Sequence, residues 1–187
     1  MASRDGRGPL TSLVRGILGL LGGRSRSSAQ AKSPRSRPTT TPALSPGQGG
    51  QTATREVRPP ARGRLTITYA PQRDGAPDAG EIVWTWVPYE ENDGRGKDRP
   101  VLVIGHDGAD RVFAVRLTSK AHDGDRDYLS IGTGPWDSQG RPSWVDIEQL
   151  YSVHVRGMRR EAAALDRRRF AAVAGALQGR YGWLNEV

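Results

Sequence analysis

The sequence contains no cysteine and only three histidines. The absence of cysteine excludes a disulfide framework, a thiolate zinc site and a cysteine nucleophile. Three histidines are too few for a His-rich metal cage. The chain also lacks the signatures of a phosphate-binding nucleotide loop and of a serine-hydrolase elbow. We therefore expect a protein with no metal site and no cofactor.

Aromatic residues and negative charge are both scarce in the first third of the chain. Every Trp, Tyr and Phe lies at Tyr69 or later, and residues 1–64 carry 12 Lys and Arg against two acidic residues. Residues 65–187 carry 16 basic and 18 acidic residues, so the first third holds all of the net charge of +8. A basic Pro-, Gly- and Ser-rich segment without aromatics buries too little apolar surface to offset its chain entropy. The composition predicts a low-complexity tail over 1–64, disordered from about residue 22, and one folded domain over 65–187.

The tail contains one apolar stretch, residues 10–21, in which Leu, Val and Ile recur at helical spacing. This pattern is compatible with an amphipathic helix that rests on a membrane or a partner, but it favours a weak, mostly unstructured helix. The stretch is too short to span a bilayer, and Arg15 interrupts it, which disfavours a secretion signal. We expect a cytoplasmic protein without stable membrane anchoring.

Short runs of strand-forming residues, separated by Gly, Pro and Asp, make up most of the predicted domain. Several short strands at such close spacing are typical of a small barrel or sandwich. We therefore predict a mainly β fold, a small antiparallel SH3-like barrel. A charged loop is expected at 89–98, and strands are expected over 81–88, 101–105, 111–118, 128–131, 143–149 and 153–155.

A C-terminal helix should pack on the barrel. Asp166 is a suitable N-cap, and one apolar stripe at helical spacing follows it. Arg167, Arg168 and Arg169 fall in the first turn, where the helix dipole disfavours cations. Either a ligand or an acidic neighbour lies there, or the turn is simply exposed. The stripe consists of Phe170, Val173, Ala174, Leu177 and Tyr181.

Four segments in a fixed order carry a resemblance to a known family. Gly80–Trp84 opens a strand, and Arg99–Ile104 (Arg-Pro-Val-Leu-Val-Ile) follows the charged loop. Leu117-Thr118-Ser119 ends the third strand, and Ser143–Gln149 lies late in the sheet. In this order the chain resembles, from about residue 78 to 185, the MazF/PemK toxins of type II toxin–antitoxin systems. No single motif is specific, but the ordered set is moderately so.

The resemblance implies a homodimer of SH3-like barrels with endoribonuclease (mRNA interferase) activity on single-stranded RNA, without a metal. It also implies a cognate antitoxin as partner, with DNA contacted only through a toxin–antitoxin complex. The two catalytic positions of the family correspond to Arg99 and Thr118. Ser119 would substitute for Thr118 if the register slips by one residue.

The chemistry of these residues is compatible with the resemblance. Metal-free cleavage uses the RNA 2′-OH as nucleophile, so the protein must mainly stabilise charge on the phosphate. The planar fork of Arg99 suits this task, and Thr118 can hydrogen-bond the phosphate or the 2′-OH. The alternatives are an ion pair of Arg99 with Glu90, Glu91 or Asp98, and an ordinary strand-end role for Thr118.

Further residues are candidates for contacts with RNA. His122 is a rival general base or phosphate contact, although a loop histidine is more often merely solvated. Trp136 lies on a turn and would either stack an unpaired base or cover the end of the barrel. The predicted RNA-binding residues are Lys97, Arg116, Lys120, Trp136, Ser143 and Gln149.

Two departures from the family pattern bear on RNA binding, specificity and activity. Tyr151 stands where relatives often carry a basic residue, and the loop at 89–98 is acidic, which is unfavourable beside RNA. A non-catalytic inhibitor of the CcdB type, or an adaptor that binds a nucleic-acid-associated protein, would use the same barrel. The presence of both Arg99 and Thr118 favours the enzyme.

Overall fold

The computed structural model describes residues 44–187 except 73, 90 and 92, with the backbone alone for 160–162. The helix predicted over 10–21 lies outside the described residues. Within them, no helix is both long and apolar enough to cross a bilayer.

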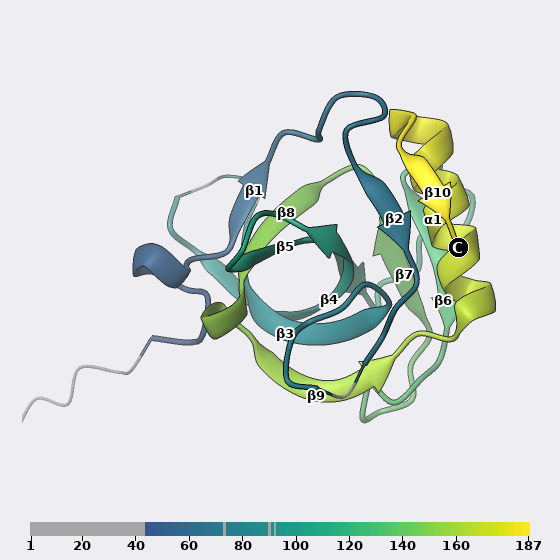
Figure 1. Cartoon of the computed structure of the whole chain (residues 1–187). Coiled ribbons are helices and arrows are strands. Elements are labelled where there is room, and N and C mark those ends of the chain that lie inside the picture. The colour runs from purple at the N-terminus through teal and green to yellow at the C-terminus, as the bar shows by residue number, and fades with distance from the viewer. Residues whose placement is uncertain (1–43, 73, 90, 92) are drawn as a thin grey trace, which may run out of the picture. The chain divides into compact units, whose positions relative to one another are not determined.

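An eight-stranded antiparallel sheet forms most of the fold and curls round on itself (Figure 1). Its main path runs β1-β8-β5-β4-β3-β9, and β7 joins it through β5 and carries β6 on its other side. A parallel pair, β2 (Thr66–Thr68) and β10 (Leu184–Glu186), completes the strands. The mainly β fold class is therefore confirmed. The strands of the large sheet are β1 (Arg55–Val57), β3 (Glu81–Pro88), β4 (Gly96–His106), β5 (Arg111–Thr118), β6 (Tyr128–Gly132), β7 (Ser143–Asp146), β8 (Leu150–His154) and β9 (Arg159–Ala164).

Alternation along the strands places apolar side chains on both faces of the sheet. Ile82 lies opposite Leu102 and belongs to the larger hydrophobic cluster, whereas its neighbour Val83 lies opposite Val101 and belongs to the smaller one. The strands β3, β4 and β5 are therefore buried on both sides. This double burial explains why their sequences are nearly continuous apolar runs.

The predicted C-terminal helix is present as α1 (Arg167–Tyr181). The Asp166 carboxylate accepts a hydrogen bond from the backbone N–H of Arg169, which is the expected N-cap. The helix ends at Gly182, whose φ of 67° lies in the left-handed region that glycine adopts without strain. Its buried side chains join the larger cluster and are Phe170, Val173, Ala174 and Leu177.

The folded unit begins earlier than the sequence analysis predicts. Residues 44–64 belong to it, because β1 pairs with β8 and the Thr54 hydroxyl lies 2.7 Å from that of Thr85. Further along, the Pro60 carbonyl accepts a hydrogen bond from Trp183 Nε1 at 2.8 Å. This segment needs no aromatic residue of its own, because it adds backbone hydrogen bonds and small side chains to an existing sheet. The predicted boundary at residue 64 is therefore wrong for residues 44–64.

Two short 3-10 turns lie against each other, η1 (Gly50–Thr52) within this segment and η2 (Val155–Gly157) directly after β8. The charged loop is also shorter than predicted. Strand β4 begins at Gly96, so Lys97, Asp98 and Arg99 lie within the strand and not in the loop. Their side-chain directions are consequently fixed by the sheet.

Candidate functional site

A cavity of about 260 Å³ opens where strands β3, β4 and β5 meet the loops that flank β6 and β7. In the antiparallel register of β4 and β5, Val101 lies opposite Arg116, and two residues further along Arg99 comes level with Thr118. Both residues line this cavity. Sequence-distant segments thus converge on it, and the lining residues are Trp84, Lys97, Asp98, Arg99, Pro100, Leu117, Thr118, Ser119, Lys120, Trp136, Asp137, Arg141 and Ser143.

Arg99 is half-buried and has no ion pair with a carboxylate among the described residues. Its Nε is buried and has no hydrogen-bond partner there. Burial, followed by the nearby charge of Arg116, lowers the pKa of Arg99. The alternative ion pair with Asp98 is not formed, because Asp98 pairs with Arg159 of β9. Glu90 lies outside the described residues, and within them no carboxylate competes with an anionic ligand for the Arg99 guanidinium.

Thr118 is the last residue of β5, and it pairs with Trp144 of β7. Its hydroxyl accepts a hydrogen bond from the backbone N–H of Lys120 at 3.2 Å. This contact turns the chain away from the strand, and it places Ser119 and Lys120 on the cavity wall as well.

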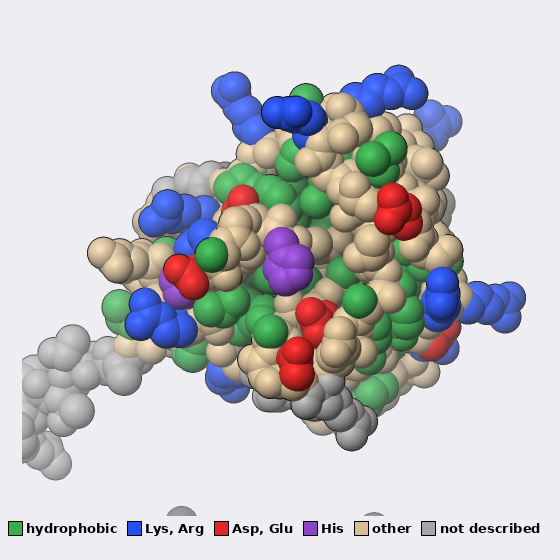
Figure 2. Space-filling view, viewed as in Figure 1, with side chains coloured by type: hydrophobic (Ala, Val, Ile, Leu, Met, Phe, Trp, Pro, Cys, Tyr) green, Lys and Arg blue, Asp and Glu red, His purple; other side chains and the backbone are tan. Residues whose placement is uncertain are grey.

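Cations outnumber carboxylates in the cavity lining, with Lys97, Arg99, Lys120 and Arg141 against two aspartates. The charge of Arg99, then burial, then Arg141 lower the pKa of Lys97, as expected where cations gather. The Nε of Arg141 lies 2.8 Å from the Asp137 carboxylate. Outside the cavity, the face seen in Figure 2 mixes both signs without a continuous basic patch of described residues. The local charge of the cavity is thus positive although residues 65–187 carry a net charge of −2.

Trp136 is 3% exposed, and its Nε1 donates to the Ser143 hydroxyl at 3.1 Å. The ring is therefore part of the cavity wall, as in the covering role, and is not an exposed platform for stacking. Ser143 is buried in the same contact. Both residues define the shape of the cavity.

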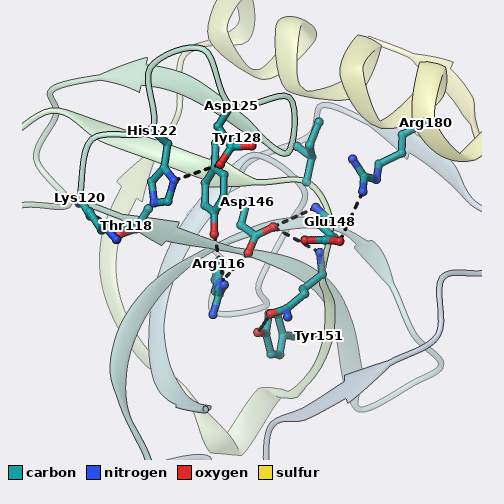
Figure 3. Close-up of polar contacts among 12 residues, drawn as sticks. Arg116, Thr118, Lys120, His122, Asp125, Tyr128, Asp146, Glu148, Tyr151 and Arg180 are labelled. Atoms are coloured by element: carbon teal, nitrogen blue, oxygen red, sulfur yellow. Dashed lines mark hydrogen bonds and ion pairs between the residues drawn. The ribbon is translucent and has the colours of Figure 1, made fainter. Parts of the chain in front are cut away.

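Two other predicted residues, Arg116 and His122, lie in a polar network beside the cavity (Figure 3). The buried Arg116 pairs with Asp146, with Nε 2.7 Å from Oδ2, and lies 3.3 Å from the Tyr128 hydroxyl. The ring of His122 stacks on Tyr128 at 3.5 Å between centroids. His122 does not line the cavity and instead lies 3.4 Å from the carboxylate of Asp125. This network ties the loop after Thr118 to the sheet.

Gln149 also has an internal partner, since its Oε1 accepts a hydrogen bond from the Tyr151 hydroxyl at 2.6 Å. Tyr151 is 1% exposed, and burial raises its pKa. Tyr151 is therefore a buried side chain close to the charges of Arg99 and Arg116, and it takes no surface position where a basic side chain would contact RNA directly.

Sequence reasoning did not single out six of the lining residues, of which Trp84, Asp98, Asp137 and Arg141 carry polar groups. Trp84 belongs to the alternating pattern of strand 81–88, which is typical of core residues. Asp98 falls in the charged stretch 89–98, whose composition predicts a loop. The Gly-Arg-Pro turn at Arg141 is the only local signal for a fixed basic residue.

A second cavity of about 370 Å³ is lined by Tyr89, Glu91, Arg95, Arg99 and Arg116, so Arg99 borders both cavities.

Several solved structures are similar to part of this chain. MazF (Form-I) from Deinococcus radiodurans is 26% identical over 57% of this chain and 97% of that chain, with a TM-score of 0.44. MazE-MazF (Form-II) from the same organism is 23% identical over 57% and 96%, also at 0.44. An endoribonuclease from a mycobacterial species is 17% identical over 58% and 93%, at 0.42. No curated protein sequence matched the chain significantly.

A family profile also matches the chain, and its description is PemK-like, MazF-like toxin of type II toxin-antitoxin system. It matches residues 78–179, more than half of the chain, and this range includes Arg99, Thr118 and every other residue that lines the main cavity. The resemblance seen in the sequence is thereby confirmed, and the chain belongs to the PemK-like, MazF-like toxin family of type II toxin–antitoxin systems.

Proposed function

We propose that the protein is an endoribonuclease that cleaves single-stranded RNA, with Arg99 and Thr118 as its catalytic residues. The observation that carries this proposal is the half-buried guanidinium of Arg99, which has no carboxylate partner among the described residues and lies with Thr118 in a cationic cavity. A fixed guanidinium binds two phosphate oxygens and keeps its charge, so it suits a phosphate that gains negative charge during reaction. Membership of the toxin family supports the same reaction class.

In the proposed reaction the RNA 2′-OH attacks the adjacent phosphorus, and the bond from phosphorus to the 5′-oxygen breaks. The products carry a 2′,3′-cyclic phosphate and a 5′-OH. Arg99 stabilises the charge on the non-bridging oxygens and donates a hydrogen bond to the leaving 5′-oxygen, which takes a proton from water. The proton of the 2′-OH passes to water, and the Thr118 hydroxyl orients the 2′-OH or a phosphate oxygen. No metal or cofactor is needed for these steps.

Family membership also supports a proteinaceous antitoxin as a binding partner of this chain. We include in the proposal a homodimeric toxin that is held inactive in that complex. Contact with DNA would then occur only through the toxin–antitoxin complex.

The proposed reaction is tested by incubating the purified full-length protein with single-stranded RNA of mixed sequence in EDTA. Fragments with 2′,3′-cyclic phosphate and 5′-OH ends, identified by mass spectrometry, are expected. Cleavage that leaves 5′-phosphate ends would contradict attack by the 2′-OH. A protein that leaves the RNA intact would instead fit a non-catalytic inhibitor or adaptor.

The basic tail is expected to strengthen RNA binding without taking part in cleavage. Deleting residues 1–43 removes eight Lys and Arg against one Asp, so affinity at low salt should fall and its salt dependence should flatten. Deleting residues 1–64 should in addition lower the Tm, because β1 and the Thr54–Thr85 contact are lost. Anisotropy titrations at several salt concentrations, with thermal unfolding of both truncated proteins, check this. An unchanged salt slope in the shorter deletion would contradict the role of the tail.

A further inference from the structure

Residues 44–57 precede the range that the family profile matches, residues 78–179, yet they are built into the same folded unit. Strand β1 pairs with β8 at one end of the main sheet path (Figure 1). Earlier in the segment, the Pro46 carbonyl accepts a hydrogen bond from the backbone N–H of Trp86 in β3 at 3.0 Å. The segment therefore links β8 to β3, two strands that are not neighbours in the sheet.

A pair of buried hydroxyls forms the side-chain contact between this segment and β3. Thr54 is 6% exposed, and Thr85 is fully buried. The Thr85 hydroxyl donates its single proton to the Gly157 carbonyl at 2.7 Å, so Thr54 is the donor in the hydrogen bond of 2.7 Å between the two hydroxyls. A Cβ at Gly47 would overlap the Thr85 hydroxyl, so the backbone of the segment also covers it closely. The Thr85 side chain is thus held in one orientation.

Thr85 lies directly opposite Arg99 in the register of β3 and β4. Side chains that oppose each other in an antiparallel pair share one face of the sheet, with Cβ atoms about 4.5–5.5 Å apart. Val83 and Val101, two residues away on the same strands, both belong to the smaller hydrophobic cluster, which identifies this face. Arg99 Nε is buried without a hydrogen-bond partner among the described residues. Thr85 is therefore the cross-strand neighbour whose hydroxyl would accept from Arg99 Nε if its side chain were free to turn.

We propose that Thr54 is a positioning residue for Arg99, because it holds the Thr85 hydroxyl away from the guanidinium. This inference rests on the proposed function. With Thr54 in place, Arg99 keeps its guanidinium for a phosphate in the main cavity, whose wall it forms. Without the Thr54 hydroxyl, Thr85 turns toward Arg99 Nε and draws the guanidinium away from that phosphate. A segment that precedes the family range thus keeps the site preorganised.

Thr54→Val tests the proposal in the full-length protein, because valine keeps the shape of threonine and removes only the hydroxyl. Single-turnover cleavage of a defined RNA should slow about tenfold, within the loss of up to about 100-fold that a misplacement of about 1 Å causes. Thr54→Ser keeps the hydroxyl and should recover most of the rate. The double variant Thr54→Val/Thr85→Val should cleave faster than Thr54→Val, since no hydroxyl remains to capture Arg99. Its Tm should nevertheless be the lowest of the series, because the Gly157 carbonyl loses its partner.

Thr52→Val is the matched control, because Thr52 lies in the same segment and its hydroxyl donates to the Gly49 carbonyl at 3.4 Å, away from β3. This variant should cleave at the wild-type rate. The NMR signal of Arg99 Nε–H, assigned with Arg99→Lys, gives a readout that is independent of cleavage. It should move downfield in Thr54→Val, as expected on hydrogen bonding to Thr85, and should return in the double variant.

Three results would overturn the inference. They are a Thr54→Val rate within about twofold of wild type, a double variant that cleaves more slowly than Thr54→Val, and an Arg99 Nε–H signal that Thr54→Val leaves unmoved. The proposed function can fail separately. Cleavage by the wild type with an unmoved signal would leave the proposed function intact, whereas a moved signal in a protein that does not cleave RNA would contradict the proposed function alone.

Discussion

Replacing Arg99 with alanine is expected to lower the rate of RNA cleavage about 100- to 1000-fold, the usual effect of removing one preorganised donor to a developing charge. The Tm should stay unchanged or rise. Arg99 has no carboxylate partner among the described residues, and burial of its charge is unfavourable, so the folded state loses no favourable contact with it. Single-turnover cleavage of a defined RNA and thermal unfolding of the same preparation measure the two effects.

Arg126→Ala is the matched control for charge. Arg126 is exposed in the loop before β6 and lies outside the cavity, so this variant should cleave at the wild-type rate. Arg99→Lys should recover only part of the activity, because an ammonium cannot bind two phosphate oxygens with one planar fork. A fall in Tm parallel to the loss of activity in Arg99→Ala would show that Arg99 has a structural role instead.

Asp146→Ala is expected to destabilise the domain by about 3–5 kcal/mol, the range for breaking a buried ion pair on one side. Asp146 is 1% exposed, and its loss removes the carboxylate that lies 2.7 Å from Nε of the buried Arg116. The same side chain also accepts hydrogen bonds from the backbone N–H groups of Glu148 and Gln149 through Oδ1. Urea unfolding followed by tryptophan fluorescence gives the free energy of unfolding directly.

The control for this variant is an ion pair on the surface. Asp93→Ala removes the partner of Arg95, whose side chain is 67% exposed, and should change the free energy of unfolding by less than about 1 kcal/mol. The double variant Arg116→Met/Asp146→Leu should recover part of the stability, since it removes both buried charges. Similar losses in Asp146→Ala and Asp93→Ala would mean that burial of the Arg116 pair is energetically unimportant.

Local sequence patterns predicted the regular elements with close bounds. The strands at 81–88 and 111–118 and the helix that follows Asp166 appear as predicted, because alternation, helical spacing and an N-cap act over a few neighbouring residues. The sequence analysis missed β1, β2 and β10, of three residues each, and β9. Each is held by backbone bonds to a strand far along the chain, for which a short local pattern has no signal.

The candidate site was predictable only in part. The family resemblance indicated Arg99 and Thr118, and the pairing of β4 with β5 brings them to one cavity. No local pattern distinguishes Asp98 from a loop carboxylate. Its side chain is held by an ion pair with Arg159, which lies sixty-one residues later in the chain. Arg116 was predicted to contact RNA, but it pairs with Asp146. This pairing depends on β7 lying beside β5, which only the tertiary structure shows.

The sequence by itself determined that the chain combines a strongly basic first third with a near-neutral, strand-rich domain. It also determined where most strands and the helix lie, because these depend on contacts between near neighbours. Only the tertiary structure decided that the fold begins by residue 44 and that Lys97, Lys120 and Arg141 gather around Arg99. The reason is physical: charge and burial at a site are set by distances between side chains, and strand pairing fixes those distances between residues that the sequence keeps far apart.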